Sequence, residues 1–254
     1  MNDQDQPDIN VIIRNGYSVD IGDFLSRGWK ILRSNLGLFF VFELFTFVVG
    51  NALEYLPTGI AALFVMSTPL YAGGLIVAFR VAKGQEVRFK NFFDGFKKAY
   101  FFEILLITLM VCILIVLCFI PAVITFQLSG IGSNSSHALS SEISIDVAML
   151  ILTLLLAILG ILGAIYVGVS YFFAIPLVIG LRMDCGPAME ASRKLVHRNW
   201  LGMFGLNLVI GLIFFCSLPF GELGEIITDP LETCIIAAAY ERIIGLPNFD
   251  SSQD

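Results

Sequence analysis

The sequence predicts an all-α membrane protein with six transmembrane helices, built as three hairpins that repeat in parallel, with both chain ends in the cytoplasm. Apolar residues make up 57% of the 254-residue chain and charged residues only 14%. A soluble domain of this size could not bury so much apolar surface. Several stretches also reach the length of about 18 residues with few charges that a membrane helix needs.

Six apolar runs give the predicted spans, which are residues 36–56, 58–80, 102–127, 147–181, 201–219 and 225–245. The fourth run is too long to cross a hydrocarbon core of about 30 Å as one upright helix. We therefore expect it to tilt, to extend past the bilayer or to kink, with Pro176 as the expected place of the kink. The sixth run is the weakest, because Glu225, Asp229 and Pro230 lie in its first half, and whether it spans fully stays open.

The basic residues predict the topology. The fifteen lysines and arginines lie before the first run, between the second and third, between the fourth and fifth, and near the end of the sixth. The connections at 51–58, 128–146 and 220–225 carry acidic residues and no basic ones, so the positive-inside rule places both termini in the cytoplasm. The first 34 residues are mostly polar and show no cleavable signal peptide. We expect a disordered N-terminus at 1–17, one six-helix domain at 18–245 and a cytoplasmic tail at 246–254.

A basic amphipathic stretch precedes each predicted hairpin, at 20–35, 87–100 and 186–199. Apolar residues recur in these stretches at helical spacing, with lysines and arginines on another side. Such helices lie in the membrane interface, where their cations face anionic headgroups. The predicted headgroup contacts are Arg27, Lys30, Arg33, Lys90, Lys97, Lys98, Arg193, Lys194 and Arg198.

Two similar segments suggest an internal repeat. KILRSNLGLFF (30–40) and KLVHRNWLGMF (194–204) align with Asn35 on Asn199, and TPLYAGGLIVAFR (68–80) resembles DPLETCIIAAAYER (229–242). These matches predict a triplicated hairpin whose middle copy has diverged, and all copies run in the same sense, unlike the inverted repeats of many transporters. The alternative is that similar segments arose independently as signals for membrane entry.

Catalytic and metal-binding motifs are missing from the sequence. There is no H-E-x-x-H, C-x-x-C, P-loop or G-x-S-x-G pattern, and His137 and His197 are predicted on opposite sides of the membrane. Cys112 and Cys118 are interpreted as small core residues. The sequence therefore predicts no enzyme, no cofactor and no bound metal.

Polar residues within the apolar runs are the candidate site. Glu222, Glu225, Asp229 and Glu232 share one helical face, which indicates either a proton or cation site or a solvated outer rim with only Glu232 submerged.

Glu43 lies in the first span, where a charge costs about 2.5–3.5 kcal/mol at the bilayer centre and usually faces the bundle interior. Asn207 is its counterpart in the repeat, and the pair could form interhelical hydrogen bonds or a substrate site. The candidate polar or ion site is thus Glu43, Asn207, Glu225, Asp229 and Glu232. A separate stripe of small residues, Gly160, Ala164 and Gly168, predicts close helix packing within the monomer or between subunits.

Several motifs also carry a family resemblance. In chain order they are GWKILRSN, PLYAGG, FFDGFKK, FAIPL and GPAMEASRKLVHRNW. Over about residues 18–245 the chain resembles a group of poorly characterised bacterial six-helix integral membrane proteins, similar to the membrane domain attached to some glycerophosphodiester phosphodiesterases. The resemblance implies a multi-pass protein of the bacterial cytoplasmic (inner) membrane. It does not imply phosphodiesterase activity, because the chain lacks room for that catalytic domain and lacks a metal-ligand cluster.

Two functions follow as hypotheses. The first is a non-enzymatic role in membrane organisation, envelope maintenance or assembly of partner proteins. The alternative is a transporter or channel for a small solute or ion that uses the acidic membrane residues. An intramembrane enzyme acting on lipids would need a catalytic constellation that the sequence does not contain. Expected partners are membrane lipids, other membrane proteins or a second copy of the chain, and no nucleic acid.

Overall fold

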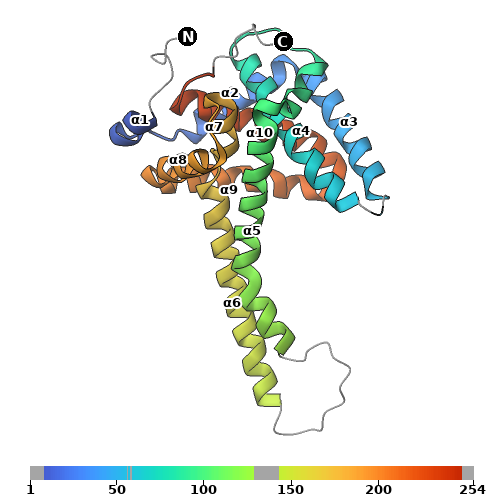
Figure 1. Cartoon of the computed structure of the whole chain (residues 1–254), viewed down its shortest axis with the longest axis vertical. Coiled ribbons are helices and arrows are strands. Elements are labelled where there is room, and N and C mark those ends of the chain that lie inside the picture. Colours follow the sequence, from blue (N-terminus) through green and yellow to red (C-terminus); the bar gives the residue numbers. More distant parts are fainter. Residues whose placement is uncertain (1–8, 56, 58, 129–142, 248–254) are drawn as a thin grey trace. The chain divides into compact units, whose positions relative to one another are not determined.

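The computed structural model describes residues 9–55, 57, 59–128 and 143–247, and this part of the chain contains helices and no strands. It thus confirms the all-α class (Figure 1). In chain order the elements are α1 Ile9–Asn15, α2 Ile21–Ser34, α3 Leu36–Glu54, α4 Gly59–Ala82, the 3-10 helix η1 Phe89–Phe96, α5 Lys98–Leu128, α6 Ile143–Ser170, α7 Ala174–Leu181, α8 Cys185–Arg198, α9 Trp200–Ser217, the 3-10 helix η2 Leu218–Phe220 and α10 Glu222–Ile243.

Five segments of the described chain are long and apolar enough to cross a membrane, which indicates a multi-pass membrane protein. They are Leu36–Leu53, Ala61–Ala82, Lys98–Leu128, Val147–Leu181 and Trp200–Phe220, close to the first five predicted runs. The prediction of six such spans is wrong, because the sixth run, now α10, is not among them. The first half of α10 carries four acidic residues, and its apolar part, Cys234–Tyr240, is buried inside the protein.

The long fourth run is interrupted, as the sequence predicts. Helix α6 ends at Ser170, and α7 begins at Ala174 just ahead of Pro176. Proline has no N–H and its ring crowds the preceding turn, so an uninterrupted helix through this point would be strained. The backbone N–H of Phe173, at the interruption, donates to Ser192 Oγ at 3.1 Å. The interruption is therefore stabilised within the protein, because its buried amide has a partner.

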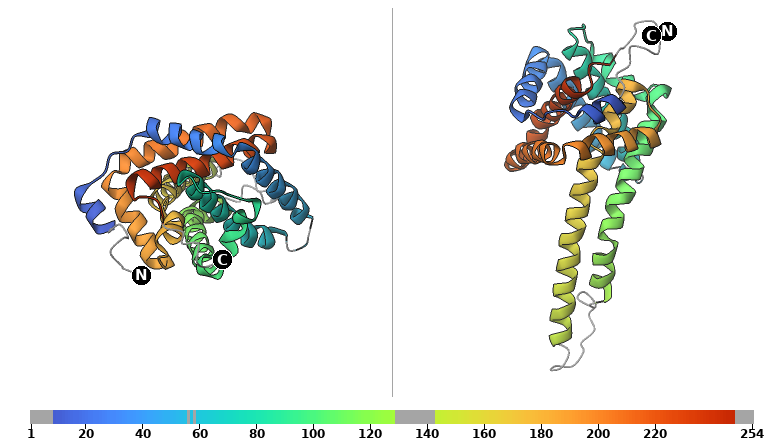
Figure 2. Two further views of the ribbon diagram at one scale, coloured as in Figure 1. Left: turned by 90° about the horizontal axis from the view of Figure 1, so that it is seen from above. Right: turned by 90° about the vertical axis from the view of Figure 1, so that its left-hand side faces the viewer.

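The chain divides into two compact units, whereas the sequence predicts one domain at 18–245. Unit 1 comprises Met1–Ile107 and Tyr171–Asp254, and unit 2 comprises Thr108–Ser170. In unit 2 the helices α5 and α6 lie side by side (Figures 1 and 2). A Cβ on Gly160 would approach the Cys118 carbonyl oxygen at 2.8 Å, whereas one on Gly168 would meet nothing within 4 Å. The predicted small-residue stripe thus packs within the hairpin at Gly160, and its Gly168 end lies open.

In unit 1, each stretch predicted to be a basic interfacial helix packs on a later or earlier helix of the same unit. Helix α2 lies along α10, η1 packs on α4, and α8 packs on α7. Glycines allow two of these approaches. A Cβ on Gly28 would lie 2.8 Å from the Ile235 Cα, and Gly73 lies directly against the Phe92 carbonyl. The apolar residues Phe24, Ile31 and Leu32 of α2 are therefore buried within the protein.

Aromatic side chains fill the centre of unit 1. Phe79 of α4 and Tyr240 of α10 are fully buried, with ring centroids 5.0 Å apart. Phe173 lies beside them, 6.4 Å from Tyr240. A second cluster joins α3 to η1, where Phe42 stacks on Phe92 with centroids 4.0 Å apart. Such pairs bury large areas and fix helix positions.

The repeated segments adopt the same local structure. Asn35 (φ −136°, ψ 34°) joins α2 to α3, and Asn199 (φ −139°, ψ 59°) joins α8 to α9. Each backbone N–H bonds back to the preceding helix, at Leu32 and Val196 respectively. Both segments therefore form the same kind of helix-to-helix junction, whereas a triplication of whole hairpins stays a prediction.

Part of the N-terminus expected to be disordered is ordered. Residues 9–15 form α1, and the Tyr17 hydroxyl donates to the Leu195 carbonyl at 2.9 Å. Asn199 Nδ2 also donates to the Tyr17 carbonyl at 3.2 Å. Burial raises the pKa of Tyr17 above its usual value. Low hydropathy alone did not reveal these contacts with α8. Residues 1–8, His137 and the tail from residue 248 lie outside the described residues.

Candidate functional site: an acidic cavity

A cavity of about 320 Å³ lies in unit 1 between α3, α4 and α10. Its lining includes three carboxyl side chains, those of Glu43, Asp229 and Glu232. Among the residues that line it there is no lysine, arginine or histidine. This is therefore a concave site with an excess of negative groups.

The carboxyl groups come from two helices. Glu43 belongs to α3, where Thr46 Oγ1 donates to its Oε2 at 3.1 Å and to its backbone carbonyl at 2.8 Å. Asp229 and Glu232 are three residues apart on α10, so they lie on one face of that helix. Thr233 Oγ1 donates to the Asp229 carbonyl at 2.9 Å. The close packing of α3, α4 and α10 brings the three carboxyls to one cavity.

Apolar side chains form much of the remaining wall. Phe42 of α3 and Leu63, Met66 and Leu70 of α4 contribute to it. Tyr71 lies at the edge with 37% of its surface exposed. The cavity thus combines acidic groups with apolar walls, a pairing that suits an amphipathic cation better than a bare ion.

A second cavity extends the acidic lining along α10. It has a volume of about 180 Å³ and shares Glu43, Thr46 and Asp229 with the first cavity. It adds Glu225. Glu225, Asp229 and Glu232 therefore follow one face of α10, with Glu225 nearest its N-terminal end, and Glu43 of α3 lines both cavities.

The structure brings together four of the five predicted site residues. Glu43, Glu225, Asp229 and Glu232 line the two cavities. Asn207 does not line either; its Nδ2 donates to the Met203 carbonyl of its own helix at 3.0 Å. The structure thus does not bring Asn207 to the cavity that Glu43 lines, because a short amide can bond to the preceding helical turn. The side chain of Glu222 lies outside the part that the structure describes.

Sequence reasoning missed the hydroxyl-bearing residues of the cavity. These are Thr46, Ser67, Tyr71 and Thr233. The spacing of Thr46 three residues after Glu43 was a usable signal, since such pairs share a helix face. The other three depend on α4 and α10 packing together, which no local pattern reveals.

The arrangement of the cavity carboxyls bears on what they could bind. The described residues contain no group of three or more His, Cys, Asp or Glu side chains placed to hold one metal ion. The acidic groups are instead spread over the cavity wall.

The structure divides the nine predicted headgroup cations into two groups. Four are in ion pairs: Arg27 lies 2.9 Å from Asp23, Lys97 lies 3.2 Å from Asp94, and Arg193 and Lys194 lie 2.8 and 3.3 Å from Glu190. The other five are exposed and form no ion pair with any described residue: Lys30, Arg33, Lys90, Lys98 and Arg198. We call the first group the paired cations and the second the unpaired cations.

Although Glu190 is exposed, its ion pairs with Arg193 and Lys194 change its pKa strongly. Hydrogen bonding from Arg193, followed by that from Lys194, lowers the pKa of Glu190 to about 2. These are contacts between neighbouring turns of α8. The paired cations are therefore engaged by the protein's own carboxylates.

Comparison with known proteins places the chain in a family. No curated protein and no solved structure matches it. A family model described as "Protein of unknown function (DUF975)" matches residues 28–246. Since the match takes in most of the chain, including the cavity and the five spans, the protein belongs to this uncharacterised family.

Proposed function

We propose that this chain is a multi-pass membrane protein that binds a small cationic solute in the acidic cavity, as a transporter or channel for that solute would. The supporting observation is the cavity of about 320 Å³, lined by Glu43, Asp229 and Glu232 and by no basic residue. The proposed role involves no enzymatic reaction and no resident cofactor.

Electrostatics favours a cation in this place. Carboxylates that are partly withdrawn from water repel one another and lose hydration, and a bound cation relieves both effects. The volume falls in the range of small-molecule pockets. Together with the apolar wall, this favours an organic amine with a short apolar body over a bare inorganic ion.

A binding experiment tests the proposal. Protein in lipid nanodiscs is heated with sodium, ethylammonium or hexylammonium chloride, and the unfolding temperature is followed. A ligand at one hundred times its dissociation constant adds about 2.7 kcal/mol to the free energy of unfolding. We expect the alkylammonium ions to stabilise the wild type more than sodium does, and the double variant Glu43→Gln, Glu232→Gln to lose that difference.

The control is Glu86→Gln, which removes the same charge from an exposed position outside the cavity. It should behave as the wild type does. Uptake of the same amines into liposomes then separates a transporter from a binding protein. Equal stabilisation of the wild type and the double variant, or no stabilisation of the wild type by any of the cations, would contradict the proposal.

A second candidate function is the organisation or assembly of other membrane components. It is favoured by unit 2, where α5 and α6 expose apolar side chains such as Leu117, Leu155 and Leu159. In this function the cavity carboxyls are dispensable. A cellular phenotype that persists in the Glu43→Gln, Glu232→Gln variant would favour this second role.

The finer location and topology are also proposals. The motifs support a bacterial cytoplasmic membrane and a likeness to phosphodiesterase-linked membrane domains, with no phosphodiesterase activity. The basic residues support both termini in the cytoplasm. With five spans, that topology requires α10 to return through the membrane enclosed by protein. Thiol labelling of Asp94→Cys and of a cysteine added after residue 254 tests this, since both must react only from the cytoplasmic side.

A further inference from the structure

The unpaired cations lie at or near the N-terminal ends of three membrane spans. Arg33 lies just before the span that begins at Leu36, Arg198 just before the one that begins at Trp200, and Lys98 is itself the first residue of the third. Since neighbouring Cα atoms are only about 3.8 Å apart, these side chains must lie at the level of the bilayer surface. Their position follows from chain connectivity alone.

Aromatic side chains accompany these cations; Trp29, Phe93 and Phe96 are exposed and Trp200 is half-buried. On α2, Phe24, Gly28, Ile31 and Leu32 are buried, whereas Trp29 is 48% exposed. Trp29 and Arg33 are four residues apart, so they share the outer face of α2.

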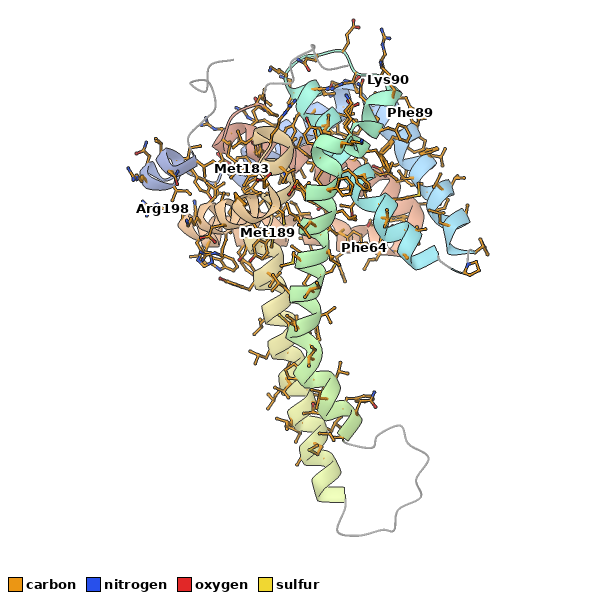
Figure 3. All side chains as sticks on the ribbon, in the orientation of Figure 1. Phe64, Phe89, Lys90, Met183, Met189 and Arg198 are labelled. Carbon is orange, nitrogen blue, oxygen red and sulfur yellow. The ribbon has the colours of Figure 1, made fainter. Side chains whose placement is uncertain are left out.

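The other two entry points repeat the pattern. Trp200 directly follows Arg198 and Asn199, and its ring lies 5.9 Å from that of His197. On η1, Phe93 and Phe96 are each 36% exposed beside the exposed Lys90 and Lys98. Figure 3 labels Phe89 and Lys90 on this element and Arg198 on α8. Amphipathic aromatic rings favour the headgroup level of a bilayer.

We propose that these three faces bind anionic lipid headgroups of the phosphatidylglycerol class, through the unpaired cations, while the paired cations hold the protein's own helices. The faces are Trp29 with Lys30 and Arg33, Phe93 and Phe96 with Lys90 and Lys98, and Trp200 with Arg198. Charge complementarity supports a lipid partner, since an anionic leaflet attracts each nearby cation. Continuity with the spans supports it too. The proposal does not depend on ligand binding in the acidic cavity.

The two tryptophans of the chain, Trp29 and Trp200, report on two of the faces directly. Protein is reconstituted in phosphatidylcholine that contains equal mole fractions of either brominated phosphatidylglycerol or brominated phosphatidylcholine. Bromine quenches tryptophan fluorescence only at short range, so stronger quenching by the glycerol lipid measures local enrichment. An attraction of the size known for one surface cation corresponds to about fivefold enrichment.

Matched arginine variants test the division between paired and unpaired cations. In the Trp200→Phe background, the quenching of Trp29 is compared between Arg33→Gln and Arg27→Gln, which lie on the same helix. In the Trp29→Phe background, the quenching of Trp200 is compared between Arg198→Gln and Arg193→Gln. We expect the unpaired variants to lose at least half of the enrichment. The paired variants remove the same charge but should keep most of it.

Three results would overturn the proposal. They are equal quenching by the two brominated lipids in the wild type, equal losses in the paired and unpaired variants, and full reversal of the enrichment by millimolar inorganic phosphate. The last would identify a soluble anion as the ligand. Each arginine variant stands on an exposed surface, and retained helical circular dichroism verifies its fold.

Discussion

At the scale of single residues, Glu190 is held by two neighbours on its own helix. Arg193 Nε and Nη2 donate to its two oxygens at 2.9 and 2.8 Å. Hydrogen bonding of this kind favours the charged form and is stronger than between neutral groups. The lowered pKa therefore has a local cause, which loss of Arg193 would weaken.

We predict that Glu190 stays ionised well into the acid range. Because its pKa falls from 4.5 to about 2 on folding, its contribution to stability is fully present above pH 4.5 and is lost as the pH falls through 2. Arg193→Gln should raise the pKa part of the way towards 4.5, since Lys194 remains. Carbon-13 NMR of labelled glutamate measures the titration, with Arg198→Gln as an unchanged control. A wild-type midpoint near 4.5 would show that the pair is absent.

Single polar residues could be found from the sequence, but their partners could not. Glu43 and Asn207 both stand out in apolar runs, yet one lines a cavity and the other bonds to its own helix. The difference depends on the length of the side chain and on which helix packs alongside. Neither is encoded in the depth of a residue along its span.

At the scale of elements, the contact between α2 and α10 depends on a missing side chain. Gly28 lies against the backbone of Ile235. Any larger residue would force the two helices apart, and overpacking of this kind typically costs about 1–3 kcal/mol. The pair therefore offers a direct test of the packing.

We predict that Gly28→Ala lowers the free energy of unfolding by about 1–3 kcal/mol. Gly37→Ala is the matched control, since a Cβ there meets nothing within 4 Å. Its effect should be neutral or stabilising by up to about 1 kcal/mol, as alanine is the better helix former. Unfolding in mixed detergent micelles measures both. If Gly28→Ala proved as stable as Gly37→Ala, α2 and α10 would not be in close contact.

The first five spans could be predicted because each is one continuous apolar run. The sixth run was wrongly predicted to be such a span. Its apolar stretch, Cys234–Tyr240, is as hydrophobic as a membrane segment but is buried by other helices. Hydropathy registers removal from water and does not distinguish lipid from protein. For the same reason, the apolar stripe of α2 indicated a buried face but not what covers it.

At the scale of the whole molecule, unit 1 joins the beginning and the end of the chain. Helix α2 packs on α10, although about 200 residues separate them. The cavity likewise needs α3 and α4 from the first part and α10 from the last. The membrane class was evident from composition, but this closure rests on contacts between distant segments, which periodicity does not reveal.

We predict that truncation after Ser217, which removes α10, leaves α2 without its cover. Amide hydrogen exchange across Phe24–Leu32 should then become at least tenfold faster, since those residues lose their buried packing. Truncation after Pro247 is the matched control and should leave exchange unchanged. Mass spectrometry of peptic fragments measures both. Unaltered protection of α2 after loss of α10 would mean that other helices suffice to hold it.

The pairing of α2 with α10 also has a consequence for biosynthesis. A ribosome releases Ile21–Ser34 well before Glu222–Ile243, so α2 must wait for its partner while the helices between them are made. Until then, the apolar face of α2 must lie on the surface of the bilayer. Assembly of unit 1 therefore requires α2 to exchange its lipid surroundings for protein once α10 has been synthesised.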